Sequence, residues 1–226
     1  NGVHLLVTKN ENIAIRIANH LRKLNQKRRI IQDEGMTLCN QLVEKYFLAD
    51  PFIVIDAENL HEGVIGIIAG RLRDIYYKPV IVLTPSQEDG IYTGSGRSVE
   101  GFHLFDELQP AKGLMERYGG HANACGLKIK AENIQALRYY LHERVVNIEK
   151  KIPDLLIKKI NITDTLSAKD ISLELIQAVQ KLEPYGLGNE KPYFLIQNIH
   201  AGNRGEIKQM GEEGQHLKLV NFLQQD

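Results

Sequence analysis

The chain has 226 residues, of which 43% are hydrophobic and 25% are charged, so it can form one or two soluble domains with a substantial core. Its 28 basic and 28 acidic side chains cancel, which excludes a strongly basic nucleic-acid binder and leaves any contact with a polyanion to local clusters. The two cysteines are too few for a disulfide framework, and no run of about 18 apolar residues or signal-peptide pattern occurs, which predicts a cytoplasmic protein without a membrane span.

The first segment predicts a long helix. An apolar run at 4–7 is typical of the end of a strand, and Thr8 and Glu11 then have the spacing of a capping box. Apolar residues follow at helical spacing, so we expect one helix from about 10 to 47, with a kink at Gly35. A long helix at the start of a chain without an initial Met suggests a connection to a further domain.

Residues 50–150 predict a compact α/β domain. Two buried β-branched runs, 52–55 and 80–83, flank a helix expected over 61–77, and strand, helix and strand within about 30 residues indicate a βαβ unit with parallel pairing. The side chains expected to face inward from this helix are Val64, Ile67, Ile68, Leu72 and Ile75. The remaining expected elements are a strand at 91–93, a helix at 102–118 interrupted at Pro110, a strand at 127–130 and a helix at 133–149.

The chain changes character after a linker at 150–154. The following residues predict a small β-rich domain with a single helix at 173–182 and a turn-rich loop at 184–192. The expected strands are 155–162, 193–200, 205–210 and 216–223.

A glycine-rich segment at 94–98 is the first candidate binding site. Its glycines allow close approach of a ligand to the backbone, and the side chains of Ser95, Arg97 and Ser98 suit phosphate oxygens, with the guanidinium offering a bidentate fork. The alternative is a tight turn with a surface arginine.

The second candidate follows the helix expected at 102–118. Gly119 and Gly120 precede His121, and a histidine presented by glycines can donate a hydrogen bond to a phosphate or a scissile oxygen. The alternative is a helix C-terminus followed by a loop that leaves this histidine merely exposed. No further histidine or carboxylate lies at ligand spacing, so no metal site is expected here, and Cys125 is expected in the core.

Three further positions have two interpretations each. His61 opens a helix after a strand, where an anion can bind, but it can equally cap that helix. Tyr185 can stack on a base or anchor the small domain. Arg28 belongs to a basic stretch of the long helix, for which a solvated surface is the default.

The motifs together, in this order, resemble the RecJ family of the DHH phosphoesterase superfamily. The segment from His61 to Leu72 resembles the family's HxGVxGIVAxRL signature. The resemblance also includes LNxxR at 24–28, KPVIVL at 78–83, GSGRS at 94–98, GGHA at 119–122, LEPYGLGN at 182–189 and HLKL at 216–219.

This resemblance implies a domain plan. Residues 1–49 would form the connecting helix from a DHH domain that lies outside this chain, and 50–150 a mixed-sheet DHH-associated α/β domain. Residues 153–226 would form a small β-rich domain with an oligonucleotide-binding (OB) fold, without its last strands.

The family's activity is single-strand-specific 5′→3′ exonuclease action in recombination and repair. The resemblance implies that Ser95, Arg97 and Arg28 hold a DNA phosphate near the 5′ end and that His121 stabilises charge at the scissile phosphate. The Mn or Mg ions of the hydrolysis would be bound by the DHH domain, so no metal is expected in this chain and the chain alone is expected not to cut DNA. Single-stranded DNA is the implied ligand, and a single-stranded-DNA-binding protein or a helicase the implied protein partner.

Two alternative functions remain open. One is a smaller DHH phosphodiesterase of short oligonucleotides or cyclic dinucleotides, which the OB-like segment disfavours. The other is a non-catalytic module that binds nucleic acid, like the C-terminal module of alanyl-tRNA synthetases, which the segments at 61–66 and 182–189 disfavour.

Overall fold

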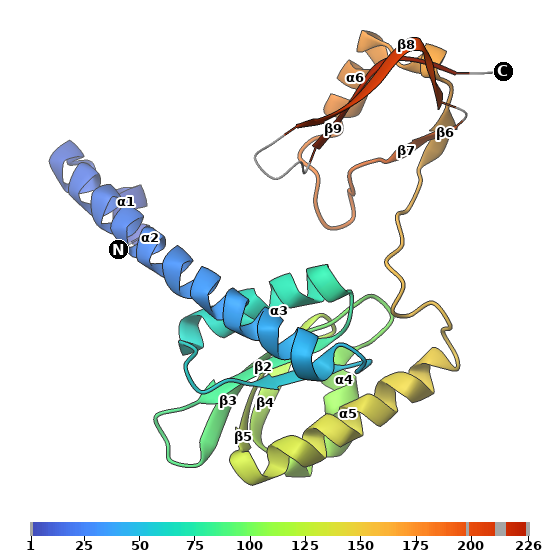
Figure 1. The fold of residues 1–226 in the computed structure, drawn as a ribbon. Coiled ribbons are helices and arrows are strands. Elements are labelled where there is room, and N and C mark those ends of the chain that lie inside the picture. Colours follow the sequence, from blue (N-terminus) through green and yellow to red (C-terminus); the bar gives the residue numbers. More distant parts are fainter. Residues whose placement is uncertain (1, 198, 211–215, 225–226) are drawn as a thin grey trace. The chain divides into compact units, whose positions relative to one another are not determined.

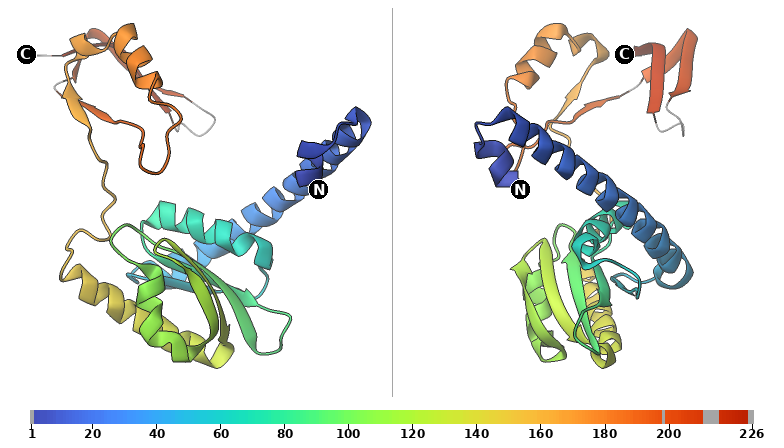
Figure 2. Two further views of the ribbon diagram at one scale, coloured as in Figure 1. Left: turned by 180° about the vertical axis from the view of Figure 1, so that it is seen from behind. Right: turned by 90° about the vertical axis from the view of Figure 1, so that its left-hand side faces the viewer.

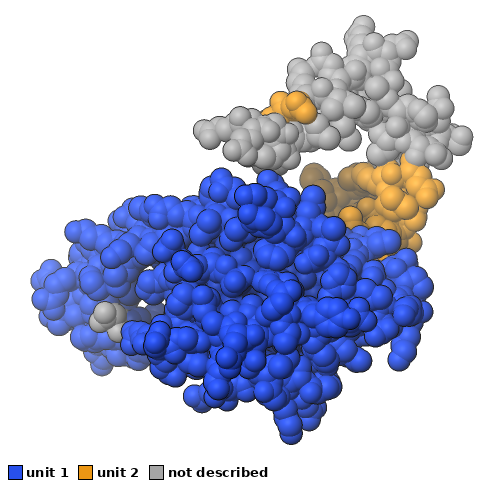
Figure 3. Space-filling model, turned by 60° about the horizontal axis from the view of Figure 1, so that its bottom comes forward, with its two compact units in different colours: residues 1–158 blue, residues 159–226 orange. Residues whose placement is uncertain are grey.

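The structure is a computed structural model in which the chain forms two compact units, residues 1–158 and 159–226 (Figure 3). Among the residues that it describes, no helix is both long and apolar enough to cross a lipid bilayer. It describes the backbone of residues 2–197, 199–210 and 216–224, and the side chains of 2–197 except 168 and of 209 and 210.

The first unit starts with helices only. The short helix α1 (Gly2–Val7) contains the apolar run that was predicted to end a strand. That prediction is wrong because four apolar residues fit either element, and no strand of the described sheet pairs with this segment. The helix α2 (Glu11–Leu42) is capped by Asn10, whose Oδ1 accepts from the backbone N–H of Ile13 at 3.1 Å, rather than by Thr8 as predicted.

Gly35, where a kink was expected, lies within the continuous helix α2. A Cβ atom at this position would lie 2.7 Å from Ile68 Cδ1 and 3.0 Å from Leu60 Cδ2, so the glycine allows the next helix to pack closely against α2. The irregular turn lies later, in a π-helix at Val43–Phe47 that follows α2 directly.

The centre of the first unit is a five-stranded mixed sheet with the order β1-β2-β3-β5-β4 (Figure 1). The first two strands are parallel, which confirms the predicted βαβ unit with α3 (Glu62–Tyr76) as its crossover helix, and all other pairs are antiparallel. The strands are β1 (Ile53–Asp56), β2 (Val80–Pro85), β3 (Ile91–Arg97), β4 (Met115–His121) and β5 (Ala124–Lys130).

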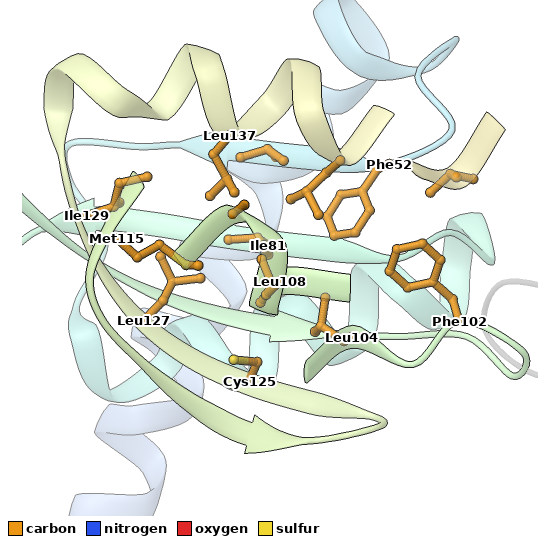
Figure 4. Packing of buried hydrophobic residues seen from close by; sticks show 14 of the residues in the cluster. Phe52, Ile81, Phe102, Leu104, Leu108, Met115, Cys125, Leu127, Ile129 and Leu137 are labelled. Carbon is orange, nitrogen blue, oxygen red and sulfur yellow. The ribbon is translucent and has the colours of Figure 1, made fainter. Parts of the chain in front are cut away.

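Helices cover both faces of this sheet (Figure 2). Val80 and Val82 of β2 share one hydrophobic cluster with residues of α2 and α3. Ile81 and Leu83 point the other way, into a second cluster with α4 (Leu104–Leu108) and α5 (Ile134–Glu149), seen in Figure 4. The four residues 80–83 are fully buried, as the uninterrupted apolar run predicted.

The helix α3 faces the sheet with a slightly different set of residues than predicted. Ile65 is buried at 3% exposure, whereas Ile75, which was expected to face inward, is 59% exposed. The helical period places Ile75 in the same sector as Val64 and Ile68, but Ile75 lies in the last turn of α3, so where the packing of the helix ends decides its exposure, not the period.

The helix predicted over 102–118 is only partly present. After α4 the chain forms a 3₁₀-helix at Gln109–Leu114, and residues 115–121 are strand β4 instead of a helix followed by a break. Pairing with β5 overrides the local pattern, and the Tyr118 ring packs on Phe105 with centroids 5.3 Å apart.

The second unit is small and β-rich, as predicted. The strands β6 (Asp164–Leu166) and β7 (Phe194–Ile196) pair in parallel, and β8 (Ile199–Met210) and β9 (His216–Gln224) pair antiparallel. The helix α6 (Leu173–Gln180) confirms the expected short helix. The strand predicted at 155–162 is not formed: Leu155 packs into the core of the first unit, and the isoleucines after it pair with none of the described strands. The remaining elements are 3₁₀-helices at Ala131–Asn133 and Ala168–Asp170.

Candidate nucleic-acid interface

The Gly-Ser-Gly-Arg segment lies in strand β3, not in the tight turn considered as an alternative. Side chains alternate along a strand, so the two glycines point to one face and Ser95 and Arg97 to the other. A Cβ at Gly94 would lie 2.5 Å from Leu83 Cδ2, and one at Gly96 would lie 2.7 Å from Leu104 Cδ2. The glycines therefore let the core pack against β3 and leave the polar side chains on the α3 face.

Ser95 and Arg97 form one polar group on this face. Arg97 Nη1 donates to Ser95 Oγ at 3.1 Å and to the carbonyl of Gly96 at 2.7 Å. Gly66 of α3 lies against both, since a Cβ there would be 3.0 Å from Ser95 Oγ and 3.1 Å from Arg97 Nη2. Because Ser95 Oγ accepts from the guanidinium, its own O–H is free to donate, and the pair offers O–H and N–H donors to an anion.

His121 lies in the same transverse row of the sheet as Arg97. The register pairs Arg97 with Ala124 on β5 and Ala124 with His121 on β4, so all three side chains belong to one face. His121 Nδ1 accepts from the backbone N–H of Asn123 at 3.3 Å, which favours the neutral tautomer with its proton on Nε2. The exposed ring can then donate from Nε2 to an oxyanion.

The turn beyond His121 is fixed from two sides. The backbone N–H of Ser98 donates to Asn123 O at 3.0 Å, and that of Leu104 donates to Ala122 O at 2.9 Å. These bonds tie the turn to the end of β3 and to the start of α4, so the imidazole and the guanidinium are carried by one rigid framework.

The two glycines before His121 have different roles. A Cβ at Gly120 would lie 2.2 Å from Ala124 O, so this position lets β4 and β5 approach. A Cβ at Gly119 would meet nothing within 4 Å and would project into open space on the face of Ser95. Gly119 is therefore the glycine that can contact a ligand.

Ser98 and His61 are placed less favourably for a ligand. Ser98 is 1% exposed and its hydroxyl donates to Phe102 O at 2.6 Å, which ties down the chain after β3 and removes this side chain from the accessible surface. His61 is the N-cap of α3, with Nδ1 accepting from the backbone N–H of Gly63 at 3.0 Å, as the capping alternative proposed.

Arg28 belongs to α2 and Tyr185 to the second unit. Arg28 lies on the exposed surface of α2. Tyr185 is half-buried in the second unit, where its hydroxyl donates to Val179 O at 2.6 Å, which is the anchoring role weighed against base stacking. In the same loop Asn189 Nδ2 donates to the carbonyls of Leu182 and Pro184.

Arg71 of α3 clamps the long helix to the sheet domain. Its Nη1 lies 3.1 Å from Asp33 Oδ1, and the amide oxygen of the buried Gln32, facing the guanidinium, accepts from Nη2 at 2.6 Å. Gln32 lies one helical turn after Arg28, so this clamp fixes the stretch of α2 that carries Arg28. The arginine of the 61–72 segment thus has a structural role.

Three side chains of this face were missed from the sequence. Thr93, Lys128 and Arg117 form the transverse row two residues from that of Ser95. Arg117 precedes His121 by four residues, and strand alternation would have placed both on one face. The incorrect helix prediction for 102–118 hid this relation.

The cysteines carry no reactive thiolate. Burial raises the pKa of the Cys39 thiol to about 11. Burial also raises the pKa of Cys125, against a smaller opposing effect of a hydrogen bond with the Gly119 backbone. Within the described part of the chain, no group of three or more His, Cys, Asp or Glu side chains is placed to hold a metal ion.

Comparison with known protein families gives two matches. A DHHA1 domain matches residues 49–147, and a RecJ OB domain matches residues 162–225.

Individual proteins agree with these matches. The chain is 30% identical to the single-stranded-DNA-specific exonuclease RecJ of Bacillus subtilis over 97% of this chain and 27% of that protein, and 32% identical to the protein of the same name from Escherichia coli over 90% and 37%. A crystal structure of RecJ in complex with Mn²⁺ from Thermus thermophilus superposes with a TM-score of 0.78 at 25% identity, covering 96% of this chain and 30% of that one. The chain thus spans about a quarter to two fifths of the length of these relatives.

Proposed function

Because this chain joins a DHHA1 domain to a RecJ OB domain and so belongs to the RecJ family, we propose that it is the DNA-holding portion of a single-strand-specific 5′→3′ exonuclease of recombination and repair. The ligand is single-stranded DNA. The substrate is named by the relatives, whereas the residues that hold it are assigned from the geometry of this chain.

The observation that carries the proposal is that polar side chains of β3 and β4 lie together on one face of the sheet. Ser95 and Arg97 are set side by side against Gly66, and His121 lies in the row of Arg97 on the same face. The guanidinium and the Ser95 hydroxyl bind the oxygens of a phosphate near the 5′ end. His121 Nε2–H donates to an oxygen of the scissile phosphate and stabilises its developing charge.

The hydrolysis itself needs groups from elsewhere in the enzyme. Mn or Mg, when bound in the complete enzyme, supplies the activated water, and the described residues of this chain gather no ligand set for such an ion. We expect the chain alone to bind single strands without cutting them. Detection of Mn-dependent nuclease activity in the purified chain would contradict this expectation.

The site of action follows from the ligand. We expect the enzyme to act in the cytoplasm, because bacterial DNA lies there. A single-stranded-DNA-binding protein or a helicase is the expected protein partner. Phosphodiesterases of short oligonucleotides or cyclic dinucleotides remain the alternative, and the match of residues 162–225 to a RecJ OB domain favours longer strands.

The test is binding of the chain to a 5′-phosphorylated single strand and to the matched duplex, measured by fluorescence anisotropy at two salt concentrations. We expect a salt-sensitive preference for the single strand that Arg97→Ala weakens by about tenfold. Arg97→Lys keeps the charge but not the planar fork, so it should restore binding only in part. Equal binding of both DNA forms, or no effect of Arg97→Ala, would contradict the proposal.

A further inference from the structure

A second feature of the same face lies beside the Ser95–Arg97 group. It is a pocket of about 380 Å³ on the β4–β5 side of the sheet, which we call the glycine pocket. Its lining comes from three adjacent strands and consists of Thr93, Gly94, Arg117, Tyr118, Gly119, Gly126, Leu127 and Lys128.

Two glycines form the floor of the glycine pocket. Gly119 of β4 and Gly126 of β5 are direct cross-strand partners, and Gly126 pairs in turn with Ser95 of β3. Both glycines are exposed, and a Cβ on either would meet nothing closer than 3.9 Å. The floor is therefore bare backbone, kept open because no side chain stands in this row between β4 and Ser95.

Arg117 differs from the other arginines of its domain in its lack of a partner within residues 50–150. The structure describes residues 50–150 throughout, and in this range every other arginine makes a hydrogen bond or an ion pair within the chain. Arg117 makes none there and is exposed. Its five N–H donors are available to a ligand in the pocket.

The rest of the lining suits an anion. It contains two cations, Arg117 and Lys128, and no carboxylate, and Thr93 adds a hydroxyl in the same transverse row. Lys128 is held in place by an ion pair with Glu88, which lies outside the lining. A ligand with several anionic oxygens can thus contact a guanidinium, an ammonium and a hydroxyl at once.

The floor of the glycine pocket, Gly126 and Gly119, lies in the same transverse row as Ser95, which is proposed to hold the first phosphate. Residues two apart on a strand are separated by about 7 Å, so the Arg97, Ser95 and Thr93 rows follow one another at about that interval. This interval is comparable to the separation of successive phosphates in an extended single strand. We propose that the glycine pocket binds a second phosphodiester of the strand whose terminal phosphate lies at Ser95 and Arg97, with Arg117 as its main ligand; the proposal rests on the proposed function.

The test separates the two phosphates by ligand length. Thymidine 5′-monophosphate carries only the terminal phosphate, whereas 5′-phosphorylated trithymidylate also carries two internal ones. Each is titrated into the chain, and the amide signals of Gly119 and Gly126 are followed by NMR. We expect Arg117→Ala to weaken trithymidylate binding about tenfold and to leave the mononucleotide unchanged, while Arg97→Ala weakens both.

Lys112→Ala is the matched control, because Lys112 is an exposed cation of the 3₁₀-helix outside the pocket lining. Equal effects of Arg117→Ala and Lys112→Ala would overturn the assignment, since the loss would then reflect net charge. A loss of mononucleotide binding in Arg117→Ala would also overturn it, because Arg117 would then hold the terminal phosphate. If Arg97→Ala changes the affinity for neither ligand while Arg117→Ala weakens trithymidylate binding, the proposed function fails at Ser95–Arg97 and the pocket is an anion site. If the parent chain binds neither ligand, both proposals are contradicted.

A second variant tests the pocket without removing charge. Gly119→Ala places a methyl group into the open pocket without a clash, and Gly113→Ala is its control, since a Cβ there also meets nothing within 4 Å. We expect the first variant to weaken trithymidylate binding several-fold with an unchanged melting temperature, and the second to bind like the parent chain. Unchanged binding by Gly119→Ala would overturn the proposal.

Discussion

The two halves of the five-stranded sheet are built for different tasks. In β2 the residues 80–83 are fully buried between helices on both faces, whereas β4 and β5 carry glycines, cations and an exposed histidine on the α3 face. The boundary lies in β3, whose glycines pack against the core while Ser95 and Arg97 lie on the α3 face. One half of the sheet is thus stabilised by burial, and the other exposes polar and cationic side chains, where we propose that the DNA strand binds.

The largest expected effect is the loss of a buried side chain from the covered half. Ile81→Ala should lower the free energy of unfolding by about 2–5 kcal/mol, because it removes a fully buried side chain and leaves a cavity. Ile75→Ala is the matched control, since Ile75 is 59% exposed, and it should cost well under half as much. Urea unfolding of both variants measures the difference, and equal losses would contradict the assignment of the core.

The next effect distinguishes the two glycines of β4. Gly120→Ala should destabilise the fold by about 1–3 kcal/mol, because its Cβ would overlap the backbone of β5. Gly119→Ala should change the unfolding free energy by about 0.5 kcal/mol or less. Thermal unfolding of the two variants checks this, and a larger loss of stability in Gly119→Ala than in Gly120→Ala would contradict the surroundings described for these two glycines.

A smaller effect on stability, but a clear one on binding, is expected at the boundary between the halves. Gly66→Ala puts a methyl group at 3.0–3.1 Å from Ser95 Oγ and Arg97 Nη2, so single-strand affinity should fall about tenfold while the fold is kept. Gly70→Ala lies on the same helix with free space around it, and it should stabilise α3 by about 0.4–1 kcal/mol with unchanged affinity. Similar affinities of the two variants would indicate that Ser95 and Arg97 do not hold the strand.

The smallest effect concerns Cys39, which packs in the cluster between α2, α3 and the sheet. Its pKa is raised by burial to about 11 from 9.0, so the folded chain keeps this proton where the unfolded chain loses it. The contribution to stability is complete below about pH 9 and decreases as the pH rises through 11. Urea unfolding should show a steeper alkaline decrease for the parent chain than for Cys39→Ala, and identical pH profiles would contradict the burial of this thiol.

The covered half of the sheet could be predicted from the sequence, and the open half could not. The apolar runs at 52–55 and 80–83 are rich in β-branched residues and each follows a proline, which favours buried strands, and the helix between them fixes their parallel pairing. By contrast, β4 contains two glycines and charged residues whose local pattern carries no strand period, and only its pairing with β5 makes it a strand. The prediction failed there because the determining contacts are not local.

The candidate site shows the same division. Ser95, Arg97 and His121 were identified from residue type, but their common row depends on the register of β3, β5 and β4. The contact of Gly66 with the Ser95–Arg97 group emerges only when α3 lies on β3.

The most direct test of the central claim is a double-mutant cycle between Arg97 and the terminal phosphate of the DNA. Affinities of the parent chain and of Arg97→Ala are measured for the same single strand with a 5′-phosphate and with a 5′-hydroxyl group. If Arg97 binds that phosphate, replacing the 5′-phosphate by a 5′-hydroxyl group should weaken binding to the parent chain about tenfold. The same replacement should hardly change binding to Arg97→Ala. Equal losses in both chains would show that Arg97 and the 5′-phosphate do not interact and would contradict the account.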